Sequence, residues 1–440
     1  MLQVIQHRKG IRPQIRRAKL SLCIAALSVT LPLACASETK FDGSWVATWS
    51  TSNMDVANPV MAGLMTGPRD FREFSNQTIR EIVHTTVAGS VTRLRLANTF
   101  GSGPVTFDAI YIGTQSQSAS VVAGSNHVVT FGGATSVAIP EGADALSDVI
   151  PMPTAAQQNV AISLYISKPT GPATFHASAF QTNYVSVEGN HVAEEGGEAF
   201  TKKIGSWFFL ASVEVLAAKK TAGAIVALGD SITDGASSRP DANERWTDVL
   251  ARRLNGNSSQ SSFAVLNAGI GGNRVLSSSP CFGENALARL NRDVFASPGV
   301  RSVILFEGTN DIGQPDTHAE AKYVPCLAKT HVTAGDLIAG YQQIIAQVHA
   351  RHLKIFGATI LPFKGFNGWT EKGEATRLEV NKWIKESRAF DGVIDFSAAL
   401  TDPENPAKLA AKYDSGDHLH PGTEGHAAMA LAIDLSMLTK

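Results

Sequence analysis

The sequence predicts an α/β protein with two parts: an all-β sandwich or jelly roll and, after it, three layers around a five-stranded parallel sheet. The first part is expected over residues 37–220, because short alternating apolar runs there are separated by Gly, Ser, Pro and Asn. The second part is expected over residues 221–440, where five short apolar runs alternate with amphipathic helical stretches. Such alternation is typical of a parallel sheet covered by helices on both faces.

The first 36 residues have the pattern of a secretory signal peptide. Six Arg and Lys residues precede the apolar run 20–34, and Ala34-Cys35-Ala36 fits a cleavage site with small residues. The apolar run is too short to span a bilayer comfortably. Two alternatives are a buried N-terminal helix and a lipid anchor on Cys35. We therefore expect an exported protein whose mature chain has no membrane span.

In the β-rich part, residues 78–100 hold two alternating runs on either side of Ala88-Gly89-Ser90, which predicts a β-hairpin. Further strands are expected at 105–113, 159–167 and 206–218.

In the α/β part, each predicted strand is followed by a predicted helix. The strands are expected at 224–229, 263–269, 302–308, 354–361 and 392–396, and the helices at 244–254, 284–295, 334–352, 373–390 and 422–438. Ligands of such sheets bind beyond the carboxyl ends of the strands. The residues that follow each strand are therefore the candidates for chemistry.

Polar residues and glycines of catalytic type follow the first three of these strands, at Ser231, Gly272 and Asn310, and Asp417 and His420 precede the last helix. Each has a simpler interpretation when it is taken alone. Ser231 could cap a helix, the glycine and the asparagine could belong to ordinary turns, and the Asp–His pair could lie on the surface. Their coincidence at one predicted edge of the sheet favours a serine nucleophile with its base.

Four short blocks that carry these residues resemble the SGNH/GDSL hydrolases, a group of serine esterases and lipases. The blocks are Gly229-Asp230-Ser231, "NAGIGGN" with Gly272, "GTND" with Asn310, and "DHLH" with Asp417 and His420. The resemblance implies a flavodoxin-like αβα domain without a cofactor. The β-rich part in front of it resembles secreted two-domain members that deacetylate plant polysaccharides. The elbow of α/β-hydrolases is excluded, because it needs a second glycine where this chain has a threonine.

The resemblance implies a role for each residue of the site. Ser231 is the nucleophile, and His420 takes its proton and returns it to the leaving alcohol. Asp417 orients the imidazole and stabilises its charged form. The oxyanion hole is assigned to the backbone N–H groups of Ser231 and Gly272 and to the side-chain amide of Asn310.

Other residues near the blocks are weaker candidates. Asp230 is expected to order the nucleophile loop, with a simple turn as the alternative. Asn273 and Arg274 are expected to contact the substrate or to support the site, with solvated loop residues as the alternative. Cys281 and Cys326 are expected to form a disulfide between the loops that follow Gly272 and Asn310, and two free thiols are the alternative.

The composition excludes several other functions. The 440 residues carry a formal net charge of -1, which gives no basic surface for a nucleic-acid partner. The chain has neither a phosphate-binding loop nor a dinucleotide fingerprint. His349 and His352 lack a further ligand at metal-binding spacing, so we expect neither a metal nor a cofactor.

The sequence thus predicts an exported serine carboxylic ester hydrolase that acts on short acyl esters, acetyl above all, with acetylated polysaccharide as one candidate substrate. The alternatives are a lipase or phospholipase, and a carbohydrate-binding surface protein with little activity.

Overall fold

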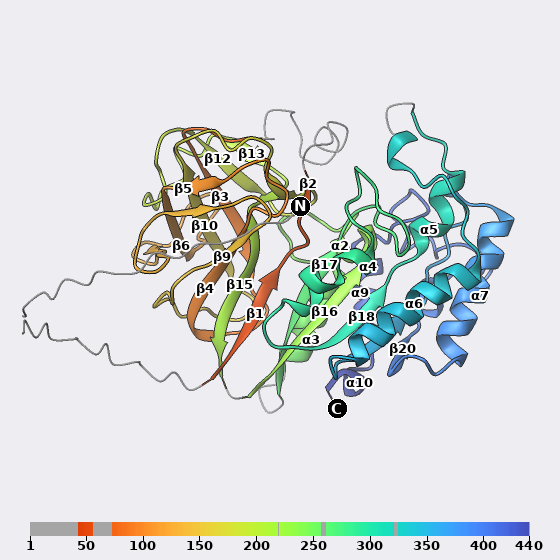
Figure 1. The fold of residues 1–440 in the computed structure, drawn as a ribbon. Coiled ribbons are helices and arrows are strands. Elements are labelled where there is room, and N and C mark those ends of the chain that lie inside the picture. Colours follow the sequence, from red (N-terminus) through yellow and green to blue (C-terminus); the bar gives the residue numbers. More distant parts are fainter. Residues whose placement is uncertain (1–42, 56–72, 219, 257–260, 321–323, 440) are drawn as a thin grey trace, which may run out of the picture. The chain divides into compact units, whose positions relative to one another are not determined.

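Five parallel strands form the sheet of the C-terminal part, as the sequence predicts (Figure 1). They are β16 (Thr221–Gly229), β17 (Ser262–Gly269), β18 (Val300–Phe306), β19 (Lys354–Ala358) and β20 (Gly392–Ile394). Their order in the sheet is β17-β16-β18-β19-β20. The first strand lies between the second and the third, so the strand order reverses at β16. Ligand sites of open α/β sheets lie at such a reversal.

The computed structural model describes residues 43–55, 73–218, 220–256, 261–320 and 324–439, all within one compact unit. The predicted signal peptide and Cys35 lie outside these residues. In the described residues, no helix is long and apolar enough to cross a bilayer.

Helices cover both faces of the parallel sheet, because successive residues of each strand point to opposite sides. Ala224, Val226 and Leu228 of β16 pack with α4, α6 and α7, whereas Ile225 and Ala227 pack with α3, α8 and α9. The helices are α2 (Ser231–Asp234), α3 (Trp246–Asn255), α4 (Ala286–Leu290), α5 (Thr309–Gly313), α6 (Ala334–His349), α7 (Glu371–Glu386), α8 (Phe396–Leu400), α9 (Thr423–Leu431) and α10 (Leu435–Thr439), with shorter turns at Asn291–Phe295, Gln314–Asp316 and Val324–Cys326.

Two antiparallel sheets form the N-terminal part, with orders β1-β15-β4-β9 and β13-β12-β3-β10-β6-β7. Their strands are β1 (Ser44–Ser50), β3 (Gln77–His84), β4 (Gly89–Ala97), β6 (Ala109–Thr114), β7 (His127–Val128), β9 (Asp144–Leu146), β10 (Asn159–Ile166), β12 (Asn183–Glu188), β13 (Lys202–Ile204) and β15 (Leu210–Ala217). Two smaller sheets have the orders β14-β11-β2 and β5-β8, built from β2 (Met54–Asp55), β5 (Val105–Phe107), β8 (Val137–Ile139), β11 (Thr174–His176) and β14 (Trp207–Phe208).

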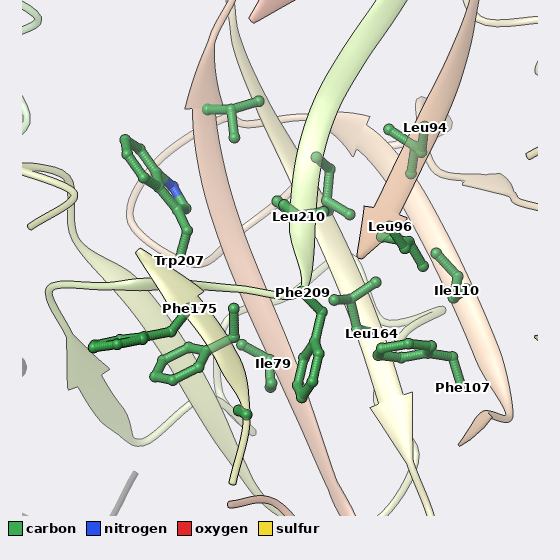
Figure 2. Packing of buried hydrophobic residues seen from close by; sticks show 14 of the residues in the cluster. Ile79, Leu94, Leu96, Phe107, Ile110, Leu164, Phe175, Trp207, Phe209 and Leu210 are labelled. Atoms are coloured by element: carbon green, nitrogen blue, oxygen red, sulfur yellow. The ribbon is translucent and has the colours of Figure 1, made fainter. Parts of the chain in front are cut away.

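The sandwich core lies between the two larger sheets. Figure 2 shows Leu94 and Leu96 of β4 on the same core as Leu164 of β10, with the Phe107 and Phe209 rings beside them. These two rings meet edge to face, with centroids 5.3 Å apart.

The prediction of a β-hairpin at residues 78–100 is wrong. Its two strands exist, but β3 pairs with β10 and β12 while β4 pairs with β15 and β9. The connection crosses from one sheet to the other, because its N–H groups have partners elsewhere: Thr85 donates to Gln158 O at 2.9 Å and Thr86 to Thr48 O at 3.0 Å. Alternating runs around a Gly-Ser turn do not distinguish these two connections.

The sandwich and the α/β part share buried residues. Val46 of β1 and Val215 of β15 belong to the same apolar cluster as Leu266 of β17. The Ala47 N–H also donates to Pro298 O at 3.1 Å, across the two parts. A shared core couples the stability of the two parts.

We predict that Phe107→Ala destabilises the whole chain rather than the sandwich alone. Removing a buried aromatic ring costs about 3–5 kcal/mol. Urea unfolding followed by tryptophan fluorescence and by far-UV circular dichroism should show one transition, moved to lower urea with both probes. Two separate transitions, of which only one moves, would contradict the coupling.

Candidate active site

Ser231 lies two residues after the end of β16 and is the first residue of the short helix α2. The cap of this helix is Asp230, whose Oδ1 accepts the Ile232 N–H at 3.0 Å. The alternative that Ser231 is the cap is therefore wrong, and its hydroxyl is available for other contacts. Gly229 allows close approach of the neighbouring strand, because a Cβ there would overlap with Phe306 O of β18.

The Ser231 hydroxyl is hydrogen-bonded to His420, with 2.8 Å between Oγ and Nε2. The other ring nitrogen of His420 lies 2.6 Å from Asp417 Oδ2. The second oxygen of Asp417 accepts the N–H groups of Leu419 at 2.9 Å and His420 at 2.8 Å. One short turn before α9 thus holds both the base and the carboxylate that orients it.

The environment of Asp417 keeps its carboxylate ionised. Partial burial raises the pKa, but the His420 hydrogen bond and charge, with the two backbone N–H groups, outweigh burial and hold the pKa well below its ordinary value. An ionised Asp417 fixes the proton on Nδ1 of His420 and leaves Nε2 to accept the proton of Ser231.

The two other residues predicted for the oxyanion hole lie at the same pocket as Ser231 and His420. Gly272 follows β17 with φ of +74°, and a Cβ there would lie 2.4 Å from the Phe282 ring. Asn310 lies in the first turn of α5, with its Nδ2 3.4 Å from Asp230 Oδ2. The pocket has a volume of about 820 Å³.

Asp311 is a supporting residue that the sequence analysis did not single out. Its carboxylate accepts the N–H groups of Val275 at 2.8 Å and Leu276 at 3.1 Å, which fastens the loop after β17 to α5. Burial raises its pKa to about 6, against the lowering effect of those N–H groups. The signal was available, since Asp311 is the last residue of the "GTND" block.

Asn273 and Arg274 are buried and do not belong to the described lining of the pocket. Asn273 donates to Phe282 O at 2.7 Å and to Glu284 O at 2.8 Å. Arg274 donates to Gln314 Oε1 at 2.9 Å, and Gln314 in turn donates to Gly272 O at 2.8 Å. Both residues hold the shape of the loop that carries Gly272.

A disulfide joins Cys281 to Cys326, and both residues are buried. It links the loop after Gly272 to the segment after α5, where Ser279 Oγ also donates to Cys326 O at 2.8 Å. The cross-link therefore lies between the two segments that carry Gly272 and Asn310.

His176 of β11 connects the sandwich to α2, the helix that begins at Ser231. Its Nε2 lies 2.9 Å from Asp234 Oδ1 and its Nδ1 2.8 Å from Ser52 O. The other oxygen of Asp234 accepts the Gly271 N–H at 3.1 Å, next to Gly272. Sequence reasoning missed His176, because no motif marks it in the β-rich part.

The His176–Asp234 contact is a buried pair that is ionic when the imidazole is protonated. Asp234 Oδ1 and Ser52 O both accept hydrogen bonds. The imidazole of His176 can donate to both only when each ring nitrogen carries a proton. Burial lowers the pKa of His176, but the charge and hydrogen bond of Asp234 together with the Ser52 carbonyl raise it above its ordinary value.

We predict that His176→Ala lowers the free energy of unfolding by about 3–5 kcal/mol, because it leaves Asp234 buried without its cation. Since the folded-state pKa of His176 is raised, its stabilising effect is complete below the unfolded-state value of 6.5 and is lost as the pH rises through the folded-state pKa. Urea unfolding at several pH values should therefore show a difference from the wild type that shrinks with increasing pH.

His349→Ala is the matched control for this prediction. His349 lies 3.0 Å from Asp391 in a half-exposed pair, so its loss should cost at most about 1 kcal/mol. Equal effects of the two substitutions would contradict the role of the buried pair.

Comparison with known proteins gives the relationship of the α/β part. Residues 227–428 match the family model of the GDSL-like Lipase/Acylhydrolase family, and no curated protein matches. A solved catalytic mutant of an acetylxylan esterase from Geobacillus stearothermophilus is 21% identical with a TM-score of 0.38, covering 50% of this chain and 96% of that chain. A GDSL-like lipase from Bacteroides thetaiotaomicron VPI-5482 is 19% identical with a TM-score of 0.35, covering 49% and 88%.

The matched residues contain all four blocks, and so they include Ser231, Gly272, Asn310, Asp417 and His420. Through residues 227–428, the chain is similar to the GDSL-like lipase/acylhydrolase family.

Proposed function

We propose that the chain is a serine carboxylic ester hydrolase that works through an acyl-enzyme on Ser231. The observation that carries the proposal is the hydrogen-bonded series Ser231–His420–Asp417, which opens into a pocket also lined by Gly272 and Asn310. A nucleophile, a base with its orienting carboxylate, and oxyanion donors are the set that acyl transfer requires.

In the first half of the reaction, Ser231 Oγ attacks the carbonyl carbon of the ester while His420 Nε2 takes the hydroxyl proton. The carbonyl oxygen becomes an oxyanion, for which the N–H groups of Ser231 and Gly272 and the Asn310 amide are the donors. The intermediate collapses when His420 gives the proton to the leaving alcohol. Ser231 then carries the acyl group as an ester.

In the second half, water replaces the alcohol. His420 takes a proton from the water, whose oxygen attacks the acyl carbon and forms a second oxyanion in the same hole. The Ser231 oxygen leaves and receives the proton from His420. The products are the carboxylic acid and the free enzyme, so no external cofactor enters the balance.

Asp230 supports this site from behind. It is buried, and burial raises its pKa to about 7 in spite of the Ile232 N–H. Asp230 Oδ2 lies 3.4 Å from Asn310 Nδ2. Asp230 therefore orients the Asn310 amide and also caps the helix that begins at Ser231.

We extend the proposal to short acyl groups and to export of the protein. The signal-peptide pattern of residues 1–36 supports export, and the lack of a long apolar lid segment in the sequence supports a small acyl group. The position of the β-rich part, in front of the α/β part, suggests that acetyl esters of polysaccharides are substrates. Hydrolysis of acetylated xylan and pectin tests this suggestion.

We predict that Ser231→Ala abolishes ester hydrolysis, with a fall in kcat of about 10⁴-fold or more, because no acyl-enzyme forms. The measurement is hydrolysis of short-chain esters, together with intact mass after treatment with an organophosphorus ester: the wild type gains one adduct and the variant none. Unfolding temperatures show that the variant is folded. Full activity in Ser231→Ala would contradict the assignment of Ser231 as the nucleophile.

We predict that Asn310→Ala lowers kcat by roughly 10² to 10³-fold, the usual effect of losing one oxyanion donor. Asn367→Ala is the control, because this exposed amide donates to His318 O at 3.0 Å and is not among the described residues that line the pocket. Steady-state kinetics separate kcat from KM. An unchanged kcat would remove Asn310 from the oxyanion hole.

A further inference from the structure

The pocket at Ser231 has walls from both parts of the chain. Phe282, Phe366 and Leu419 come from the α/β part, and Phe180 and Ile204 come from the sandwich. In the described part of the lining, Lys203 and His420 are the residues that can carry charge, and no carboxylate is present. Most of the exposed surface of this lining is apolar, although Ser178, Gln181, Thr182, Ser237, Gln314 and Thr317 contribute polar side chains.

The sandwich side of the pocket is held by a specific clamp. Asp241, in the segment between α2 and α3, donates its N–H to Phe180 O at 3.0 Å. Its carboxylate accepts from the Thr182 N–H at 2.5 Å, the Thr182 hydroxyl at 2.7 Å and Gln181 Nε2 at 2.8 Å. These contacts fasten the sandwich loop 178–182 to the chain segment that follows the nucleophile helix.

Phe180 lies at the centre of this clamp with φ of +45°. A bulky side chain rarely adopts a left-handed backbone, and it does so where surrounding contacts impose it. The Ala179 N–H donates to Gly205 O at 2.8 Å and thereby joins the loop to the pocket residues of β13 and its neighbour. The aromatic ring is thus placed at the pocket by the fold rather than by local preference.

The size of the pocket determines what it can hold. At about 820 Å³ it lies in the range of sites that enclose ligands of drug size, roughly 300–1,000 Å³. A short acyl group fills a small fraction of that space. The remainder is available to the alcohol part of the ester.

We propose that this pocket selects esters whose alcohol part is bulky and apolar, such as an arylalkyl group, and that Phe180 and Ile204 of the sandwich determine this selectivity. The proposal rests on the function proposed above, including its short acyl group. An apolar alcohol gains free energy when it leaves water for these side chains. A sugar of similar size would bury some of its hydroxyl groups against these apolar side chains, which offer no hydrogen bonds.

Matched substrate pairs test the proposal. Ethyl acetate and 2-phenylethyl acetate share the acyl group and have leaving alcohols of similar acidity, so chemistry differs little between them. We expect kcat/KM to be about 10- to 100-fold higher for 2-phenylethyl acetate, as expected for burial of one aromatic group. Ethyl 3-phenylpropanoate places the same phenyl group on the acyl side, and an acetylated methyl xyloside presents a polar alcohol of comparable size.

Phe180→Ala and Ile204→Ala test the residues. Each should lower the ratio of kcat/KM for 2-phenylethyl acetate over ethyl acetate by about 10-fold, and Phe180→Leu should retain part of it. Phe131→Ala is the control, because this half-buried aromatic packs on the sandwich core and is not among the described pocket residues. It should leave the ratio unchanged. Unfolding temperatures show whether each variant is folded. If Phe180→Ala does not fold, Ile204→Ala still tests the proposal.

Three results would overturn the proposal while leaving the esterase intact: equal rates on the two acetates, a higher rate on the acetylated xyloside, or a higher rate on ethyl 3-phenylpropanoate than on both acetates. An unchanged ratio in both folded alanine variants would remove the sandwich residues from selectivity. If the wild type hydrolyses none of these esters, the proposed function fails instead.

Discussion

The Asp234 carboxylate is the contact on which the catalytic edge of the sheet depends. One oxygen accepts a hydrogen bond from His176 of the sandwich, and the other accepts one from the Gly271 N–H in the loop after β17. Asp234 also ends the helix that begins with Ser231. A single buried side chain therefore contacts the helix of Ser231, the loop that carries Gly272 and the sandwich.

Three further carboxylates, Asp230, Glu307 and Asp311, are buried behind the reacting groups. Burial raises the pKa of each. The pKa of Glu307 is raised well above its ordinary value by burial and by the charges of Asp230 and Asp311, against the lowering effect of Arg289, which lies 3.8 Å away. Like charges this close oppose one another's ionisation.

The sequence was informative where a residue type and a periodicity constrain the same position. Five apolar runs predicted the five parallel strands, and Ser231, Gly272, Asn310, Asp417 and His420 were found from short blocks at strand ends. It was uninformative where a contact joins distant segments. The crossing between β3 and β4 resembled a hairpin, and His176 and Phe180 carry no local signal, because their partners lie more than fifty positions away.

The clamp between Asp241 and the loop that carries Phe180 separates two kinds of change that evolution can make. Substitutions in the sandwich loop alter the wall of the pocket, while the residues that break and form bonds belong to another part of the chain. A new preference for alcohols can then arise without loss of acyl transfer. Under the selectivity proposed above, exchange of loop 178–182 would change the preferred alcohol, as long as Asp241 is kept to hold the loop.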